Sequence, residues 1–397
     1  MDTSMASNDG AIFSMNCDRQ CSYSVVVADH VLESTASPLQ RLLHGRRALA
    51  VTTPTVHALY RQALDHFCRG GDIDLLVLDV SEDTKTLATA ERICQRALAL
   101  ALDRQAMLVS IGGGVCSDLC SVAASLIRRG IGCIRVPTTL IGQIDAALGV
   151  KGGVNFDGRK SYLGCFTAPA LVVLDPMFLR TLQRCDFQRG LAEIIKIGLV
   201  RDGGLFEVVE SAWPEFIDTR GGTPTSRLVI ERAALGMLEE LQGNPFEDKT
   251  YERLVDAGHT FSPRIEAASG FSIHHGDAVA IDLCLSATIA AEAGLMSWNT
   301  RDRVVDLIDA IGLPAFTPLA NTALCAEALM EAARHRGGHT DLVLPRRIGE
   351  AVFVKSERDL RPQLIPAAIE RLAAEASARY ASAGSTAAAK VSRGRPI

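Results

Sequence analysis

The spacing of hydrophobic residues divides the chain near residue 180. Before that point, short runs rich in β-branched residues alternate with segments of helical periodicity. The runs predict strands and the periodic segments predict helices, at residues 23–28, 47–52, 55–68, 73–80, 85–103, 106–111, 117–129 and 133–136. Strands that alternate with helices pair in parallel. We therefore expect a sheet covered by helices, with a nucleotide bound beyond the carboxyl ends of the strands.

After residue 180 long helical periods dominate, as at residues 190–200, 226–241, 276–293, 299–311 and 365–381. The expected fold class is an α/β, Rossmann-like domain over residues 23–180, followed by a mainly α-helical domain over residues 181–381. A chain of 397 residues is long enough for two such cores. Residues 1–22 and 382–397 are polar and aperiodic, which predicts disordered tails.

Composition indicates which binding partners and which cellular compartment to expect. With 48% hydrophobic residues, 22% charged residues and a net charge of −5, the chain gives no reason to expect nucleic acid or an anionic membrane as partner. The eleven cysteines show neither zinc-finger nor disulfide-scaffold spacing, which favours reduced core residues. The N-terminus lacks a signal-peptide pattern, and no stretch reaches about 18 uninterrupted apolar residues. We expect a cytoplasmic protein.

Residues 256–277 concentrate three of the nine histidines, His259, His274 and His275, among carboxylates. Imidazole and carboxylate are the usual ligands of a catalytic zinc, which keeps an open position for water or substrate. This stretch alone supports a metal site and an arrangement without a metal equally well. In that alternative His259 packs on a helix, and the two adjacent histidines lie in a solvated loop.

Two further segments indicate a site for phosphate and hydroxyl groups. Gly113 and Gly114 follow a predicted strand and precede a helix that holds Asp118. Glycines at such a turn let backbone N–H groups approach a pyrophosphate, although a tight connection also explains them. The segment after the strand at 133–136 mixes threonine, amide and charge, in Thr138, Thr139, Asp145, Lys151, Asn155 and Lys160. These residue types bind phosphates and hydroxyls, so we favour a site over a solvated loop.

Glu193 and Lys196 lie on one face of an otherwise apolar helical segment, G-L-A-E-I-I-K. A pair with this spacing is ordinarily a surface ion pair worth about 0.3 kcal/mol. Here the apolar surroundings predict partial burial, which favours a metal-ligating Glu193 beside a phosphate-binding Lys196.

Four motifs, taken in order, resemble the sugar phosphate cyclases, the dehydroquinate synthase-like superfamily. They are G-G-G-V-x-x-D, V-P-T-T-L-I-G-Q-I-D-A-A-L-G-V-K, G-L-A-E-I-I-K and G-H-T-F-x₁₃-H-G-D. The resemblance runs from about residue 25 to residue 349. It implies an NAD-binding α/β domain, a helical domain that binds zinc or cobalt, and commonly a homodimer. The implied substrate is a small phosphorylated sugar.

By motif position, the resemblance also implies site residues. The metal ligands would be Glu193, His259 and His275, since the H-x₁₅-H spacing selects His275 over His274. The residues around NAD would be Glu82, Lys85, Gly113, Gly114, Asp118, Thr138, Thr139, Asp145 and Lys160. The catalytic and substrate-binding residues would be Lys151, Lys196, Asp145, Asn155, Asp256 and Arg129, the last reaching phosphate in the same or a neighbouring subunit. Ser161 stands where the family commonly has Asn, which leaves its contact open.

The implied reaction begins with transient oxidation of a substrate hydroxyl by NAD at a metal site. Phosphate then departs by β-elimination, the hydride returns, and an intramolecular aldol step closes the ring.

Residues 252–263 depart from the dehydroquinate synthase pattern R-x-L-L-N-x-G-H-x-x-G-H. Glu252, Asp256 and Pro263 replace the Arg, the Asn and the second His. An acidic Asp256 repels a substrate carboxylate, although the adjacent Arg253 could compensate. This stretch, with E-E-L-Q-G-N at 239–244 and H-R-G-G-H at 335–339, resembles the sedoheptulose 7-phosphate cyclases, most closely the 2-epi-5-epi-valiolone synthases.

We therefore expect conversion of sedoheptulose 7-phosphate to a C7 cyclitol. The alternatives are 3-dehydroquinate synthase, 2-epi-valiolone synthase and desmethyl-4-deoxygadusol synthase, and more remotely a polyol dehydrogenase that uses NAD and zinc, or a non-catalytic binding protein. His335 or His339 could contact the substrate or lie in a basic surface loop.

Overall fold

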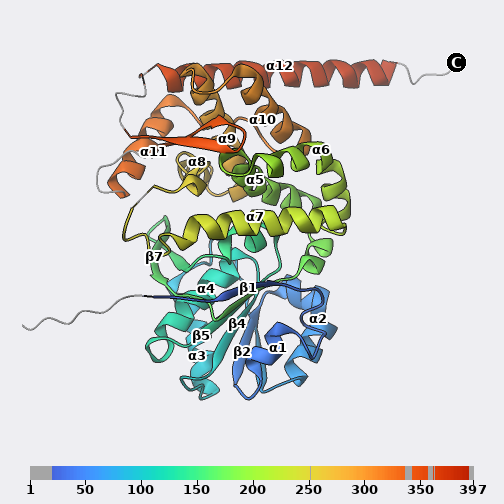
Figure 1. The fold of residues 1–397 in the computed structure, drawn as a ribbon, viewed down its shortest axis with the longest axis vertical. Coiled ribbons are helices and arrows are strands. Elements are labelled where there is room, and N and C mark those ends of the chain that lie inside the picture. The colour runs from blue at the N-terminus through green and yellow to red at the C-terminus, as the bar shows by residue number, and fades with distance from the viewer. Residues whose placement is uncertain (1–19, 251, 336–341, 356–360, 362, 393–397) are drawn as a thin grey trace, which may run out of the picture.

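The computed structural model describes residues 20–250, 252–335, 342–355, 361 and 363–392. Figure 1 shows two stacked parts, a parallel sheet covered by helices and, above it, a part built mainly of helices. The predicted fold class is confirmed. Most of the expected N-terminal tail lies outside the described residues.

Six parallel strands form the sheet, in the order β1-β8-β5-β4-β2-β3. They are β1 (Ser24–Val27), β2 (Ala48–Thr52), β3 (Ile73–Val77), β4 (Met107–Gly112), β5 (Gly132–Pro137) and β8 (Leu171–Leu174). Side chains alternate between the faces, as expected for a strand. On β2, Ala48 and Ala50 join the core on one face, and Leu49 and Val51 join the core on the other. Both faces are thus buried, as the hydrophobic runs predicted.

Helices cover each face of the sheet. Residues of α1 (Pro38–Leu43) and α2 (Pro54–Arg69) belong to the first core. Residues of α3 (Leu87–Ala99) and α4 (Gly114–Leu126) belong to the second. The helices predicted from periodicity at 55–68, 85–103 and 117–129 therefore exist, with ends displaced by a few residues.

The carboxyl ends of β5 and β8 meet at one buried side chain. Gln143 Nε2 donates hydrogen bonds to the carbonyl oxygens of Pro137 (3.2 Å) and Asp175 (2.7 Å). Gln143 belongs to η2 (Gly142–Ala146), a single turn of π-helix. Such turns are rare and are found often at functional sites. The contact fixes this turn, and with it Asp145, above the edge of the sheet where ligands bind in parallel α/β folds.

The upper part surrounds the buried helix α9 (His275–Glu292). Its other helices are α5 (Arg184–Val200), α6 (Gly203–Thr219), α7 (Pro224–Gln242), α8 (Ser262–Ala268), α10 (Trp298–Ile311), α11 (Thr322–His335) and α12 (Leu364–Ser392). The last helix is longer than predicted, so residues 382–392 are helical where an aperiodic tail was expected. The run of alanines there favours a helix, which outweighs the missing periodicity.

Two antiparallel hairpins were not predicted, β6 (Lys151–Phe156) with β7 (Arg159–Phe166), and β9 (Leu342–Arg347) with β10 (Glu350–Val354). Glycine and proline weaken the strand signal, which explains both omissions. In the first hairpin a side chain at Gly164 would overlap the carbonyl oxygen of Gly152. The same glycines that hide the hairpin in the sequence let its strands approach.

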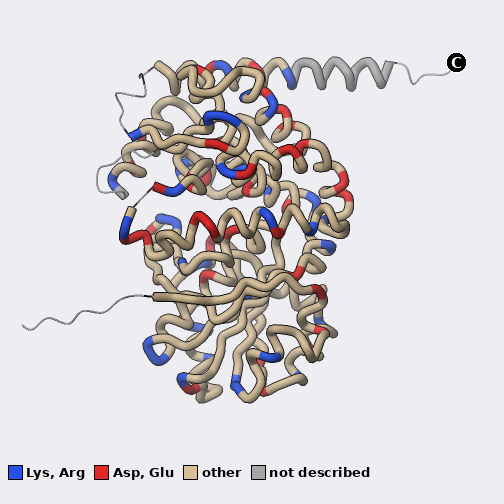
Figure 2. The backbone as a smooth tube through the Cα atoms, in the orientation of Figure 1, with Lys and Arg blue, Asp and Glu red and all other residues tan. Residues whose placement is uncertain are grey.

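Charged residues of both signs are interspersed over both parts of the molecule (Figure 2). In the described part of the chain, no helix is both long enough and apolar enough to span a bilayer.

Asp282 on α9 holds the start of α8. Its buried carboxylate accepts hydrogen bonds from the backbone N–H groups of Phe261 (2.6 Å) and Ser262 (2.9 Å), and from the Ser286 hydroxyl (3.1 Å). Burial raises the pKa of Asp282 to about 6, although these hydrogen bonds act in the opposite direction. The helix start is therefore fixed by a single side chain from a neighbouring helix.

We predict that Asp282→Ala lowers the free energy of unfolding by about 3 kcal/mol, because two buried N–H groups lose their acceptor. Asp282→Asn keeps one acceptor oxygen and should lose much less. Urea unfolding followed by circular dichroism measures both. An alanine variant with the same unfolding midpoint as the unmodified protein would contradict this role.

Candidate active site

Four potential metal ligands converge where α5 meets α9. One ligand atom from each of Asp145, Glu193, His259 and His275 lies within 4.8 Å of the others. Glu193 Oε1 is 3.2 Å from His275 Nε2 and 3.7 Å from His259 Nε2. The structure thus brings the three predicted ligands together and adds Asp145 from η2. His274, in contrast, is exposed at the N-cap of α9 and does not belong to this cluster.

Glycine makes the approach of the two helices possible. A side chain at Gly276 would overlap the carbonyl oxygen of Arg189 on α5. The first turn of α9 can therefore pack directly on the α5 backbone. This contact places His275 beside Glu193.

His259 has one ring nitrogen free for a metal. It follows Gly258, whose φ of +75° lies in the left-handed region that favours glycine. Its Nδ1 donates to the carbonyl oxygen of Ala257 at 3.2 Å, so Nε2 directs its lone pair toward Glu193. Burial lowers the pKa of His259, and the charge of Lys196 acts in the same direction. The neutral form is the one that binds metals.

His275 is held from both sides. Its Nδ1 donates to Glu266 Oε1 at 3.0 Å, and its Nε2 faces Glu193. Burial would lower the pKa of His275, but the hydrogen bonds to Glu193 and Glu266 outweigh it and raise the pKa to about 9. When no metal is bound, His275 is therefore protonated on Nε2, and its positive charge stabilises the Glu193 carboxylate beside it. Two imidazoles and a carboxylate form a donor set that fits zinc.

Glu193 and Lys196 form a buried ion pair through Glu193 Oε2, and each side chain is 1% exposed. Burial would raise the pKa of Glu193, but Lys196 and the two histidines hold it well below its usual range. Burial would lower the pKa of Lys196, yet Glu193 and Asp145 raise it. Both groups are therefore charged. The pair is more deeply buried than the sequence predicted.

A cavity of about 1090 Å³ opens between the two parts. Seven of the predicted site residues line it, namely Asp118, Asp145, Lys151, Lys160, Lys196, Asp256 and His259. It therefore extends from the metal-ligand cluster to the first turns of α4.

The start of α4 has the geometry of an anion site. Gly113 is the N-cap, and none of the described side chains caps the helix there. A side chain at Gly113 would lie 3.2 Å from Thr139 Cγ2, and one at Gly114 would lie 3.1 Å from Ala146 Cβ. Thr138 donates its N–H to the carbonyl oxygen of Gly112 at 2.9 Å. Gly113 and Gly114 thus pack closely against Thr139 and Ala146. The backbone N–H groups of the first turn of α4 can therefore bind an anionic ligand.

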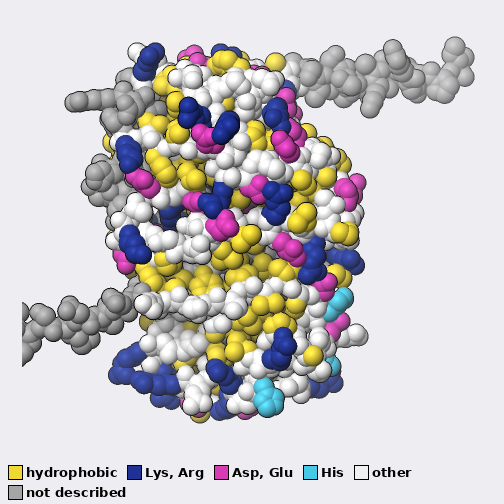
Figure 3. Space-filling model, in the orientation of Figure 1, with side chains coloured by type: hydrophobic (Ala, Val, Ile, Leu, Met, Phe, Trp, Pro, Cys, Tyr) yellow, Lys and Arg dark blue, Asp and Glu magenta, His cyan; other side chains and the backbone are white. Residues whose placement is uncertain are grey.

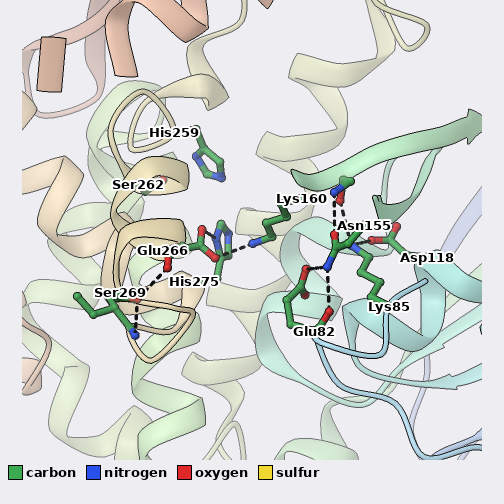
Figure 4. A network of polar contacts seen from close by, with 12 residues as sticks. Glu82, Lys85, Asp118, Asn155, Lys160, His259, Ser262, Glu266, Ser269 and His275 are labelled. Atoms are coloured by element: carbon green, nitrogen blue, oxygen red, sulfur yellow. Dashed lines mark hydrogen bonds and ion pairs between the residues drawn. The ribbon is translucent and has the colours of Figure 1, made fainter. Parts of the chain in front are cut away.

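A second polar cluster lies beside this helix (Figure 4). Lys85 Nζ is 2.5 Å from Asp118 Oδ2 and donates to Ser161 Oγ at 3.1 Å. Asn155 Nδ2 donates to the carbonyl oxygen of Glu82 at 2.8 Å, and its Oδ1 accepts the N–H of Ser161 at 2.8 Å. The predicted cofactor residues Glu82, Lys85 and Asp118 therefore lie together. Asn155, which was expected to hold substrate, is instead bonded within this cluster.

Glu247 was not predicted as a site residue, since F-E-D-K has the composition of a solvated loop. Its carboxylate forms ion pairs with Lys151 and Arg253 at the cavity wall. Arg253 also pairs with Asp256 at 2.7 Å. Asp256 therefore does not present an uncompensated negative charge. Of the two possibilities that the sequence left open, the structure shows the one in which Arg253 compensates the charge of Asp256.

Glu266, the second residue that was not anticipated, lies one turn after Pro263 on α8. It accepts from His275 Nδ1 and lies 2.6 Å from Lys160 Nζ. Its only signal in the sequence is its place within the histidine-rich stretch.

One predicted contact is not made within the described part of this chain, and two others cannot be followed there. Arg129 is exposed in η1 (Ile127–Arg129), with a φ of +68°, and does not line the cavity, so a contact from a neighbouring subunit stays a prediction. The His335 side chain and His339 lie outside what the structure describes.

We predict that His275→Ala loses bound zinc while His274→Ala retains it, because of these two adjacent histidines only His275 directs a nitrogen at Glu193. Metal content after dialysis, measured by mass spectrometry, separates the two. Zinc retained by the first variant and lost by the second would overturn the choice of ligand.

Comparison with known proteins places the chain in a family. Residues 75–189 match 3-dehydroquinate synthase N-terminal, and residues 190–335 match 3-dehydroquinate synthase C-terminal. The chain is 38% identical to a 2-epi-5-epi-valiolone synthase of Streptomyces hygroscopicus subsp. jinggangensis, over 90% of each chain. It is 33% identical to a 3-dehydroquinate synthase of a Synechococcus species, over 84% of this chain and 92% of the other.

A solved structure agrees with these matches. The 2-epi-5-epi-valiolone synthase of the same Streptomyces, with NAD+ and Zn2+ bound, has a TM-score of 0.87 and 37% identity to this chain, covering 91% of this chain and all of the other. The chain belongs to the 3-dehydroquinate synthase family of sugar phosphate cyclases.

Proposed function

We propose that this protein converts sedoheptulose 7-phosphate to 2-epi-5-epi-valiolone and phosphate. The observation that carries this proposal is that one cavity is lined both by Asp145 and His259 of the metal-ligand cluster and by several cationic side chains. The higher identity to 2-epi-5-epi-valiolone synthases than to dehydroquinate synthases supports the choice of reaction.

The residues present fit both cofactors. Glu193, His259 and His275 would hold zinc or cobalt through one carboxylate oxygen and two Nε2 atoms. NAD would lie with its pyrophosphate at the start of α4 and with Lys85 and Asp118 near its nucleotide end. When bound, NAD supplies a reversible hydride acceptor, and the metal supplies a Lewis acid for a hydroxyl oxygen.

The chain's own cations would bind and orient an anionic substrate. Lys151 lies at the cavity wall in an ion pair with Glu247, and a substrate phosphate can replace that carboxylate through charge-assisted hydrogen bonds. Lys196 is paired with Glu193 in the metal-ligand cluster. Its positive charge would stabilise a negatively charged substrate oxygen near that cluster. These contacts stabilise the phosphate as it leaves with the electrons of the C–O bond.

Enclosure favours ring closure. A cavity that holds both ends of a seven-carbon chain makes the aldol step intramolecular, which can be worth on the order of 7–11 kcal/mol when the reacting atoms are well placed. The hydride removed in the first step returns after elimination, so the overall reaction releases phosphate with no net oxidation.

An ion pair at the cavity wall supports a substrate without a carboxylate. Arg253 is paired with Asp256, and both residues line the cavity. A substrate carboxylate would have to displace Asp256 from Arg253, whereas a hydroxyl-rich neutral end need not. Pro263 occupies the cavity wall where the dehydroquinate synthase pattern has a histidine that could donate a hydrogen bond.

We also infer a homodimer in the cytoplasm. Figure 3 shows hydrophobic side chains gathered across the face between α7 and β1, and Leu228 and Leu235 on α7 are about half exposed, at 50% and 55%. Exposed apolar areas of this kind mark protein interfaces. The cysteines in the described part of the chain are free thiols, which suits a reducing compartment.

We predict that the purified protein, supplied with NAD and zinc or cobalt, converts sedoheptulose 7-phosphate to a phosphate-free cyclitol without accumulating NADH. Phosphate release, NADH absorbance and NMR of the product measure this. Turnover of only the seven-carbon carboxylated sugar acid of the shikimate route would show that the chosen branch is wrong. Net NADH production from a polyol would indicate a dehydrogenase.

A further inference from the structure

Glu266 connects the two sides of the cavity. Its Oε1 accepts a hydrogen bond from His275 Nδ1 at 3.0 Å, and its Oε2 lies 2.6 Å from Lys160 Nζ (Figure 4). Lys160 is on β7, in the hairpin of the sheet-containing part, and His275 begins α9. The Glu266 side chain is 5% exposed, so both of its carboxylate oxygens serve contacts inside the protein.

The Glu266 contact sets the state of the metal-ligating ring. A carboxylate only accepts, so His275 Nδ1 carries the proton, and Nε2 is the nitrogen that binds a metal. An imidazole that donates to a carboxylate is fixed in orientation and becomes a more basic ligand. Lys160 shares the same carboxylate and draws negative charge away from His275. The negative charge that acts on His275 therefore depends on whether Lys160 stays bound to Glu266.

Of Lys160, Glu266 and His275, Lys160 is the residue whose side chain can exchange its present partner for a ligand. Its side chain is 29% exposed and lines the cavity. Glu266 is held on α8, whose start is anchored by Asp282, and Ser269 Oγ donates to the Glu266 carbonyl oxygen at 2.8 Å. A ligand in the cavity can thus recruit the ammonium group without moving the carboxylate.

We propose that Glu266 couples binding of the dinucleotide to binding of the metal. When NAD draws Lys160 away from Glu266, the full carboxylate charge acts on His275, and the metal binds more tightly. The inference rests on the proposed function, because it requires NAD and zinc to share this cavity. By thermodynamic linkage, zinc must tighten NAD by the same factor.

Three proteins test the coupling. The zinc dissociation constant is measured by chelator competition with and without saturating NAD, and NAD binding is measured by calorimetry with and without zinc. In the unmodified protein, NAD should tighten zinc about fivefold or more. Lys160→Met should bind zinc tightly without NAD and show no further response to it. Glu266→Gln should bind zinc about 10- to 100-fold more weakly and also show no response.

A matched control removes another ion pair of α8. Glu327→Gln breaks the exposed pair with Arg264, which shares no residue with the contacts that join Lys160, Glu266 and His275. It should keep both the zinc affinity and the response to NAD. Circular dichroism checks that each variant is folded. If Glu266→Gln does not fold, the zinc affinity of Lys160→Met with and without NAD is sufficient to test the coupling.

The outcomes separate this inference from the function on which it rests. Zinc and NAD that bind independently, a Glu266→Gln variant with unchanged zinc affinity, or a Lys160→Met variant that still responds to NAD would each overturn the coupling alone. A protein that binds no NAD would overturn the proposed function and the coupling together.

Discussion

The buried charge of Glu193 is the constraint on which the site depends. A carboxylate that is 1% exposed is stable only when it is surrounded by positive charge or hydrogen-bond donors. Lys196 occupies one oxygen, and the two histidines face the other. A metal cation can replace the proton that lies between Glu193 and His275. The positive charge that the buried Glu193 carboxylate needs for the fold to be stable can therefore come from a bound metal ion.

Several features of the fold follow from bringing this cluster together. Gly276 lets α9 touch α5, Asp282 fixes the start of α8, and Gln143 fixes the turn that holds Asp145. These contacts come from both parts of the molecule, so the cavity exists only when the sheet and the helical part are packed together. The chemistry therefore depends on long-range packing more than on any single element.

The sequence predicted much of this arrangement. The parallel sheet followed from alternating strands and helices, and the convergence of Glu193, His259 and His275 followed from motifs whose spacing is specific. Glu247 and Glu266 were out of reach, because their roles arise from contacts between segments distant in sequence. The pairing of Arg253 with Asp256 also required the structure, since adjacent charges in a sequence do not show which of them are paired.

We propose above all that Glu193, His259 and His275 hold one metal ion at the wall of the cavity. X-ray diffraction at the zinc absorption edge, on crystals grown with zinc, tests it most directly. We predict one anomalous peak at about 2.0–2.2 Å from a Glu193 oxygen and from Nε2 of each histidine. Zinc bound elsewhere, for example at His274, with no peak between these three residues, would contradict it.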